Sequence, residues 1–131
     1  MIPKAAPYDR TPVVITQSAP TAVVGGQSGT LWTYTVPAGR MLLVESFELS
    51  LTRLNVWTTP SAITLYATRN GAIILDMREY QNTVPYHDRT ALSGDSLILT
   101  AGEVLAATYA DSSVGGNHVV NAAMTGYTFL V

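Results

Sequence analysis

Asn70-Gly71 constrains the fold of this chain more than any other local feature of the sequence. Asn and Gly in this order supply the two positive-φ residues of a type I′ turn, which joins two antiparallel strands. The runs on either side, residues 62–68 and 72–80, alternate between apolar and polar side chains, as strands with one buried face do. We therefore expect a β-hairpin here. The inner face of its second strand should carry Ile73, Leu75 and Met77.

A second turn signal occurs twice. Val36-Pro37-Ala38-Gly39-Arg40 and Leu99-Thr100-Ala101-Gly102-Glu103 each place Ala-Gly between an apolar stretch and a charged residue, after which large apolar residues resume. Glycine in this position permits a tight change of direction. Each phrase therefore predicts the entrance to a new strand. Because the sequences around the two phrases do not otherwise align, they indicate recurrent turn chemistry and not a duplicated domain.

The longest regular run follows the first of these turns, over residues 40–54. The residues expected on its core face, at a period of two, are Met41, Leu43, Phe47, Leu49 and Leu51. Glu45 interrupts this face, and the run exceeds the usual strand length of about 3 to 10 residues. We therefore expect a β-bulge near Glu45 or Ser46, where one strand gains an extra residue.

The remaining sequence consists of short apolar runs separated by turn and loop residues. Further strands are expected at residues 13–16, 30–36, 95–100, 104–110 and 118–131, and residues 81–94 form the longest polar loop. No window has the 3.6-residue period of a helix. The expected fold is all-β: a single-domain antiparallel β-sandwich, jelly-roll-like, with about eight strands in residues 13–131. Residues 1–12, which contain three prolines, form an extended amino-terminal arm.

The composition favours a protein that assembles with other chains. Hydrophobic residues make up 47% and charged residues 12% of the sequence, and the charged share is about half of the roughly 25% that is usual. Exposed apolar patches, which such a composition produces, mark contact sites. The alternative to assembly is that the abundant Thr and Ser residues keep the surface solvated.

The net charge of −2 and the absence of Lys or Arg runs argue against nucleic acid as a partner.

Further features of the sequence indicate where in the cell the protein is made. The sequence contains no cysteine, which excludes disulfides and thiolate-held metals. The first residues lack the apolar stretch of a secretory signal, and no segment reaches the roughly 20 apolar residues of a membrane span. We expect synthesis in the cytoplasm and no membrane partner.

No group of residues in the sequence predicts a catalytic site. His87 and His118 are the two histidines, and with Asp88 they could hold a metal, but their spacing matches no ligand motif. Asp76 and Glu48 fall in mid-strand on expected outer faces. They could share one sheet, as the two carboxylates of a glycosidase must share one cleft, but charges on the wet face of a strand are ordinary. We therefore expect no enzyme, no cofactor and no metal site.

The candidate contact residues are aromatic and cationic side chains outside the core. Trp32, Tyr34 and Phe47 are expected to pack inside. The arm loses little entropy when it docks, because its prolines are already restricted, although such an arm can also be a disordered terminus. Aromatic residues beside loops can anchor an interface. The predicted partner-binding residues are Pro3, Lys4, Pro7, Tyr8, Arg10, Trp57, Tyr86 and Arg89.

The two Ala-Gly phrases, the arm and the size resemble the head decoration, or cement, proteins of tailed bacteriophages. The likeness covers the chain from about Thr30 onward. It implies a structural protein of the virion that is made in the host cytoplasm and added to the outside of a preformed capsid. It also implies a homotrimer that clamps neighbouring subunits of the major capsid protein. No catalytic or ligand-binding residue is carried over from this resemblance.

A carbohydrate- or receptor-binding module of a phage tail or baseplate is the alternative function. Such a module would use Trp57, Tyr80, Tyr86 and the predicted loop 81–94 as a platform on which sugar rings stack. A glycan array would separate this function from capsid decoration.

Overall fold

The protein is described here by a computed structural model that covers residues 9–16, 21–24, 27–53, 63–79, 86–111 and 117–131. Within these ranges, only the backbone is described for residues 21–24, 53, 78–79, 86–96 and 117. The strands are β1 (Thr11–Thr16), β2 (Thr21–Val24), β3 (Ser28–Thr35), β4 (Arg40–Arg53), β5 (Ile63–Arg69), β6 (Ala72–Glu79), β7 (Tyr86–Thr100), β8 (Val104–Asp111) and β9 (Asn117–Leu130). The described ranges contain no α-helix, as the sequence predicts.

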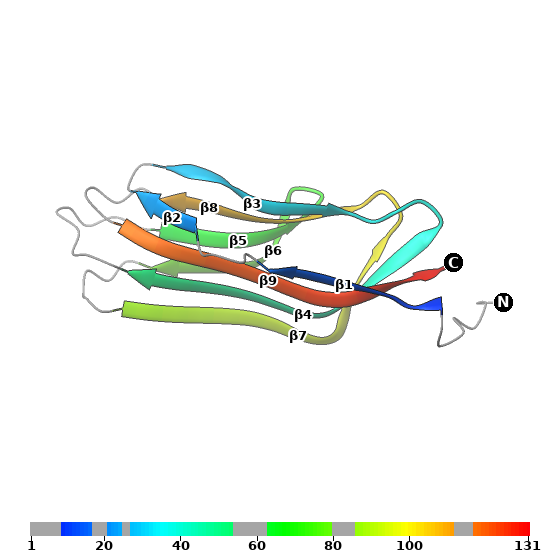
Figure 1. Ribbon diagram of the computed structural model, residues 1–131. Coiled ribbons are helices and arrows are strands. Elements are labelled where there is room, and N and C mark those ends of the chain that lie inside the picture. The colour runs from blue at the N-terminus through cyan, green and yellow to red at the C-terminus, as the bar shows by residue number, and fades with distance from the viewer. Residues whose placement is uncertain (1–8, 17–20, 25–26, 54–62, 80–85, 112–116) are drawn as a thin grey trace.

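The strands form two antiparallel sheets that stack as a sandwich (Figure 1). One sheet has the order β1-β9-β4-β7, with β2 also paired to β9, and the other has the order β3-β8-β5-β6. Because β2 continues along β9 where β1 stops, β1 and β2 together occupy one edge position. The described strands therefore fill eight positions, and their alternation between the sheets is that of a jelly roll. The predicted fold class is confirmed.

The two Ala-Gly phrases form matching turns that lie against each other. Gly39 and Gly102 both have positive φ, 74° and 84°. In each turn, the charged residue that follows donates its backbone N–H to the carbonyl three residues back. The Val36 N–H donates to the Glu103 carbonyl at 3.0 Å, and the Gly102 N–H donates to the Val36 carbonyl at 2.9 Å. Each turn carries the chain from one sheet to the other, so the prediction of two strand entrances is confirmed.

The charged residues that follow these turns form side-chain hydrogen bonds to other strands. Arg69 on β5 donates from Nε and Nη2 to the two carboxylate oxygens of Glu103, at 2.7 and 2.9 Å. This hydrogen bonding lowers the pKa of the Glu103 carboxyl and raises the pKa of Arg69. Arg40 donates to the Thr128 hydroxyl on β9 at 2.9 Å.

The hairpin at Asn70-Gly71 forms as predicted, with one difference in its second strand. Asn70 and Gly71 have φ of 50° and 83°, and β5 pairs with β6 directly across them. The register then shifts because Ile74 is an extra residue on β6. This shift leaves Ile73 61% exposed and packs Ile74 against the core. The prediction that Ile73 faces inward was wrong, because the bulge reverses the alternation at that point.

The predicted bulge in β4 is confirmed at Glu45. Against β9 the register skips from Val44 to Ser46 while Gly126 and Thr125 are adjacent, so Glu45 is the extra residue. Against β7 the excess lies on β7, where residues 94–96 stand between the partners of Val44 and Ser46. A bulge inverts which side chains face the core. Leu42 and Val44 are therefore buried before Glu45, and Phe47, Leu49 and Leu51 are buried after it. Met41 and Leu43, which were expected in the core, lie on the outer face instead.

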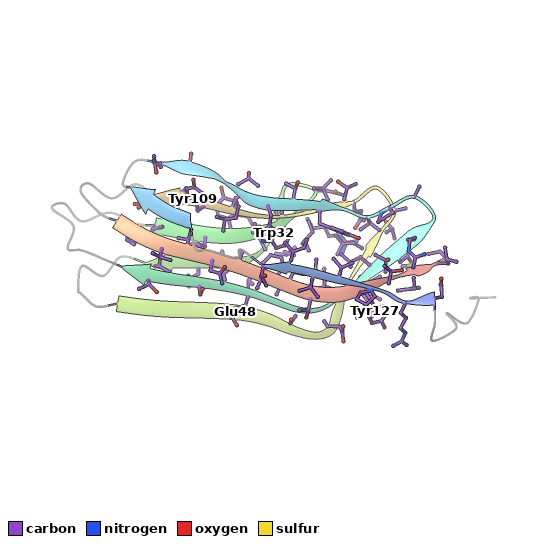
Figure 2. All side chains as sticks on the ribbon, viewed as in Figure 1. Trp32, Glu48, Tyr109 and Tyr127 are labelled. Atoms are coloured by element: carbon purple, nitrogen blue, oxygen red, sulfur yellow. The ribbon has the colours of Figure 1, made fainter. Side chains whose placement is uncertain are left out.

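The core lies between the two sheets and links them. Phe47 is fully buried, and its ring centroid lies 5.3 Å from that of Trp32 on the opposite sheet. Trp32 is only partly buried, and its indole N–H donates to the Ala122 carbonyl on β9 at 3.1 Å. Figure 2 shows Trp32 between the layers. Tyr34 packs against the same cluster, so the three aromatic residues expected to pack inside all contact the core.

The largest differences from the expected strands concern β7, β1 and β2. β7 begins at Tyr86 and pairs with β4 as far as Arg53, so residues 86–94 are strand and not loop. The long β4 explains this, since its backbone groups need a partner along their whole length. β1 begins at Thr11, within the expected arm, and β2 forms in a segment where the sequence indicates only a connection. Residues 81–85 lie outside the described residues.

Candidate interaction surface

The structure describes the predicted partner-binding residues only in part. Arg10 is described with its side chain, and it is exposed. Tyr86 and Arg89 lie on β7, where their backbones pair with Arg53 and Ser50, and their side chains are not described. The predicted contact residues that lie outside the described residues are Pro3, Lys4, Pro7, Tyr8 and Trp57, together with Tyr80 of the alternative sugar platform.

Asp9, where the described chain starts, is attached to the sandwich. Its carboxylate accepts a hydrogen bond from the Leu130 N–H at 2.8 Å, and its carbonyl accepts one from Arg40 Nη2 at 2.8 Å. The carboxylate also lies 3.9 Å from the Arg40 guanidinium. These contacts hold Asp9 against the start of β4 and the end of β9.

Arg10 covers an aromatic ring on β9. Its guanidinium carbon lies 4.6 Å from the centroid of the Tyr127 ring, which is the geometry of a cation–π contact. The Tyr127 ring lies 6.0 Å from that of Phe129. Figure 2 places Tyr127 toward the end of the sandwich where β1 begins and β9 ends. Arg10, in the described part of the expected arm, therefore lies beside a pair of aromatic rings.

These rings belong to a larger apolar area on the outer face of the β1-β9-β4-β7 sheet, here called the outer patch. Tyr127 pairs with Pro12 on one side and with Leu43 on the other, and Leu43 pairs with Ile98, so one row crosses four strands. Val14 is 67% and Ile98 40% exposed. The outer patch consists of Pro12, Val14, Met41, Leu43, Ile98, Tyr127 and Phe129.

The character of this face changes along its strands. Beyond the bulge at Glu45, the outward residues of β4 and β9 are mostly small or polar, and the Ser46 and Thr125 hydroxyls are hydrogen-bonded at 2.5 Å. Glu45 itself is exposed at the boundary between the two halves. The face therefore has an apolar end with one cation, Arg10, and an anion where the polar end begins.

The sequence contains a signal for this patch that period-two reasoning missed. Residues 41–44 are four consecutive apolar residues. In a strand, such a run places apolar side chains on both faces, so one pair must point away from the core. Only the position of the bulge decides that the outward pair is Met41 and Leu43.

The ionisable residues considered for chemistry do not form a reactive site among the described residues. His118 and Asp111 are fully buried between the sheets, with Nδ1 and Oδ2 2.8 Å apart. His118, one of the two histidines considered as metal ligands, is thus a buried partner of Asp111. Asp76 and Glu48 lie on different sheets, so the idea that they share one was wrong. In the described ranges, no three His, Asp or Glu side chains gather as metal ligands.

The comparisons with known proteins bear on the fold. The sequence matches no family model and no curated protein. A similar solved structure is dimeric latent PorU from Porphyromonas gingivalis, with a TM-score of 0.62 and 8% identity over 93% of this chain and 13% of that chain. The chain thus spans about an eighth of the length of PorU, and at this identity the likeness concerns the fold alone.

A second similar structure is a family 35 carbohydrate-binding module from Clostridium thermocellum. The match covers 86% of this chain and 97% of that chain, with 16% identity and a TM-score of 0.39. Nothing further is inferred from so distant a likeness. No helix in the described residues has the length and hydropathy to span a membrane.

Proposed function

We propose that this protein is a non-enzymatic structural protein of a phage virion, which decorates the outside of the head and clamps neighbouring subunits of the major capsid protein. The observation that carries the proposal is the outer patch, located where the arm enters the domain. The patch combines two partly buried aromatic rings with an exposed arginine, and aromatic residues and arginine dominate binding energy at protein interfaces. The resemblance in turn phrases, arm and size supports the assignment to phage heads.

The proposed mechanism divides the binding between two parts of the chain. Residues 1–8 and the adjacent surface contact the capsid, and the domains associate as a homotrimer. Three modest contacts joined through one rigid trimer raise avidity by roughly 10²–10⁴ over a single contact. Such a trimer holds neighbouring capsid subunits together against pressure from inside the head.

The test uses heads of the phage that encodes this chain, prepared without it. Purified protein is added to these heads, and its occupancy and the heat resistance of the heads are measured. Deletion of residues 1–8, which leaves Asp9 and β1 in place, should reduce occupancy at least tenfold and remove the gain in heat resistance. Full binding by the deleted chain would contradict the role of the arm, and failure of the intact protein to bind would contradict the function.

Substitutions on the two sheets provide a matched control. Val14 in the outer patch and Ile73 on the other sheet are similarly exposed, at 67% and 61%. Val14→Asp should weaken binding to the heads, whereas Ile73→Asp should leave it unchanged.

A glycan array distinguishes the alternative function, because specific sugar binding with no binding to heads would favour a receptor-binding module.

A further inference from the structure

We propose that the outer patch is the contact between copies of this chain, with Arg10 of one copy paired to Glu45 of the next. This inference rests on the proposed function and deepens it, because it assigns the outer patch to the neighbouring copy and leaves the capsid contact to the arm. Three observations support it: the exposure of the patch, the placement of its two charges and the extent of the face.

Val14 and Ile98, two of the exposed large apolar side chains, lie on this face. Val14 and Ile98 flank Leu43 and Tyr127, so the patch extends over all four strand positions of the sheet. The outer face of the other sheet is more mixed, since it carries Thr33, Thr35 and Thr64 as well as the exposed Ile73. A contiguous apolar area such as the outer patch is typical of a protein contact.

The charges of this face indicate what kind of partner fits it. Arg10 is exposed at the β1 edge, and Glu45 is exposed on β4, one strand beyond β9. Within the described residues, neither side chain forms an ion pair. Glu48, farther along β4, also lies on this face. A surface that carries a cation and an anion at separate points complements a second copy of itself, because Arg10 of one copy can meet Glu45 of the next. Repeated from each copy to the next, this contact closes into the ring of the proposed trimer.

The face is large enough for this role. β4 has 14 residues, which at about 3.4 Å each gives a length of about 48 Å, and four strand positions about 4.8 Å apart give a width of about 19 Å. The product, on the order of 900 Å², is close to the roughly 800 Å² per partner of a stable protein interface. In such a contact, the apolar end forms the core and the Ser- and Thr-rich end forms the polar rim.

The charge pair can be tested by reversal and restoration. The molar mass of the full chain is measured by light scattering at low salt over a range of concentrations, for the unchanged protein, Arg10→Glu, Glu45→Arg and the double variant. The unchanged protein should be a trimer. Each single variant should associate at least tenfold more weakly, because like charges then meet. The double variant should regain the trimer, because the pair is restored with its signs exchanged.

Controls separate folding from association and this inference from the proposed function. Circular dichroism should give the same spectrum for all four proteins, and Ile73→Asp should not change the mass. A monomeric unchanged protein, single variants with unaltered mass, or a double variant that stays dissociated would each overturn the inference. A trimer that obeys the charge test and yet does not bind phage heads would contradict the proposed function alone.

Discussion

Asp111 and His118 place two ionisable side chains in the interior, one from each sheet, with no exposed surface on either. Burial of a polar group costs little free energy when the group is hydrogen-bonded. Removal of one partner leaves the other buried without that hydrogen bond, which destabilises the folded state. The contact joins β8 to β9 across the end of the sandwich opposite the Ala-Gly turns. The pair therefore stabilises the fold.

Replacement of this aspartate should destabilise the protein. We expect Asp111→Ala to lower the free energy of unfolding by about 3 kcal/mol, because His118 loses its buried partner. Asp76→Ala is the matched control, since Asp76 is exposed on β6, and it should change stability by no more than about 0.5 kcal/mol. Urea denaturation measures both values. Equal effects of the two substitutions would contradict the structural role of the pair.

Glu103 gives stability a dependence on pH. Its pKa in the folded protein is lowered, mainly by the hydrogen bond from Arg69, so its contribution to stability is present above its ordinary pKa of 4.5 and is lost as the pH falls through the lowered value. Thermal unfolding of the unchanged protein and of Glu103→Gln should differ at pH 7. The difference should shrink steadily toward pH 3. A difference that is constant over this range would show that the carboxylate charge is not involved.

At the scale of the strand, the bulge in β4 has the widest effect on the molecule. One extra residue, Glu45, lets Leu42 and Phe47 face the same core although they are five residues apart. The partner strand is adapted to the bulge by Gly126, where any side chain would overlap the Leu43 carbonyl oxygen. The same bulge turns Met41 and Leu43 outward and so creates the centre of the outer patch.

Gly126 should consequently tolerate no side chain. We expect Gly126→Ala to lower the free energy of unfolding by about 3 kcal/mol, because the obstacle is backbone and cannot rotate away. Gly39→Ala is the control: nothing lies within 4 Å of the added atom, and only its positive φ is unfavourable, at a cost of about 1 kcal/mol. A loss no greater at Gly126 than at Gly39 would mean that β4 shifts to make room.

Local signals predict the elements well, and contacts between distant residues limit what the sequence reveals. Asn70-Gly71, the two Ala-Gly turns and the bulge at Glu45 each follow from a few adjacent residues, and the structure contains all of them. The predictions of which side chains face the core were wrong just before each bulge, at Met41, Leu43 and Ile73. The extra residue of a bulge inverts the alternation of the side chains that precede it. The approach of Asp111 to His118 depends on how two sheets stack, and no short sequence pattern reports that.

For the whole molecule, the position of the last strand dominates the architecture. β9 lies between β4 and the edge formed by β1 and β2, and β1 and β2 have no other strand partner in the described residues. The hydrogen bond between Asp9 and Leu130 spans 121 residues of sequence. Without β9, the first sheet is reduced to β4 and β7, which cannot cover the core.

A chain that ends at residue 116 should therefore lose its cooperative unfolding transition. The measurement is thermal denaturation followed by circular dichroism, with the chain that lacks residues 1–8 as the control, which should retain a single sharp transition. A sharp transition in the chain without β9 would mean that the remaining strands form a stable sheet by themselves.

The central place of β9 also determines when this protein can fold. During synthesis, β1 and β4 leave the ribosome long before the strand that pairs with both of them exists. Pairing with β9 then requires closure of a very long loop, which is a slow step. Until residues 117–130 have been made, β1 has no strand partner among the described residues and β4 has only β7 beside it, so the open edges of these two strands are the places where aggregation can begin during that interval.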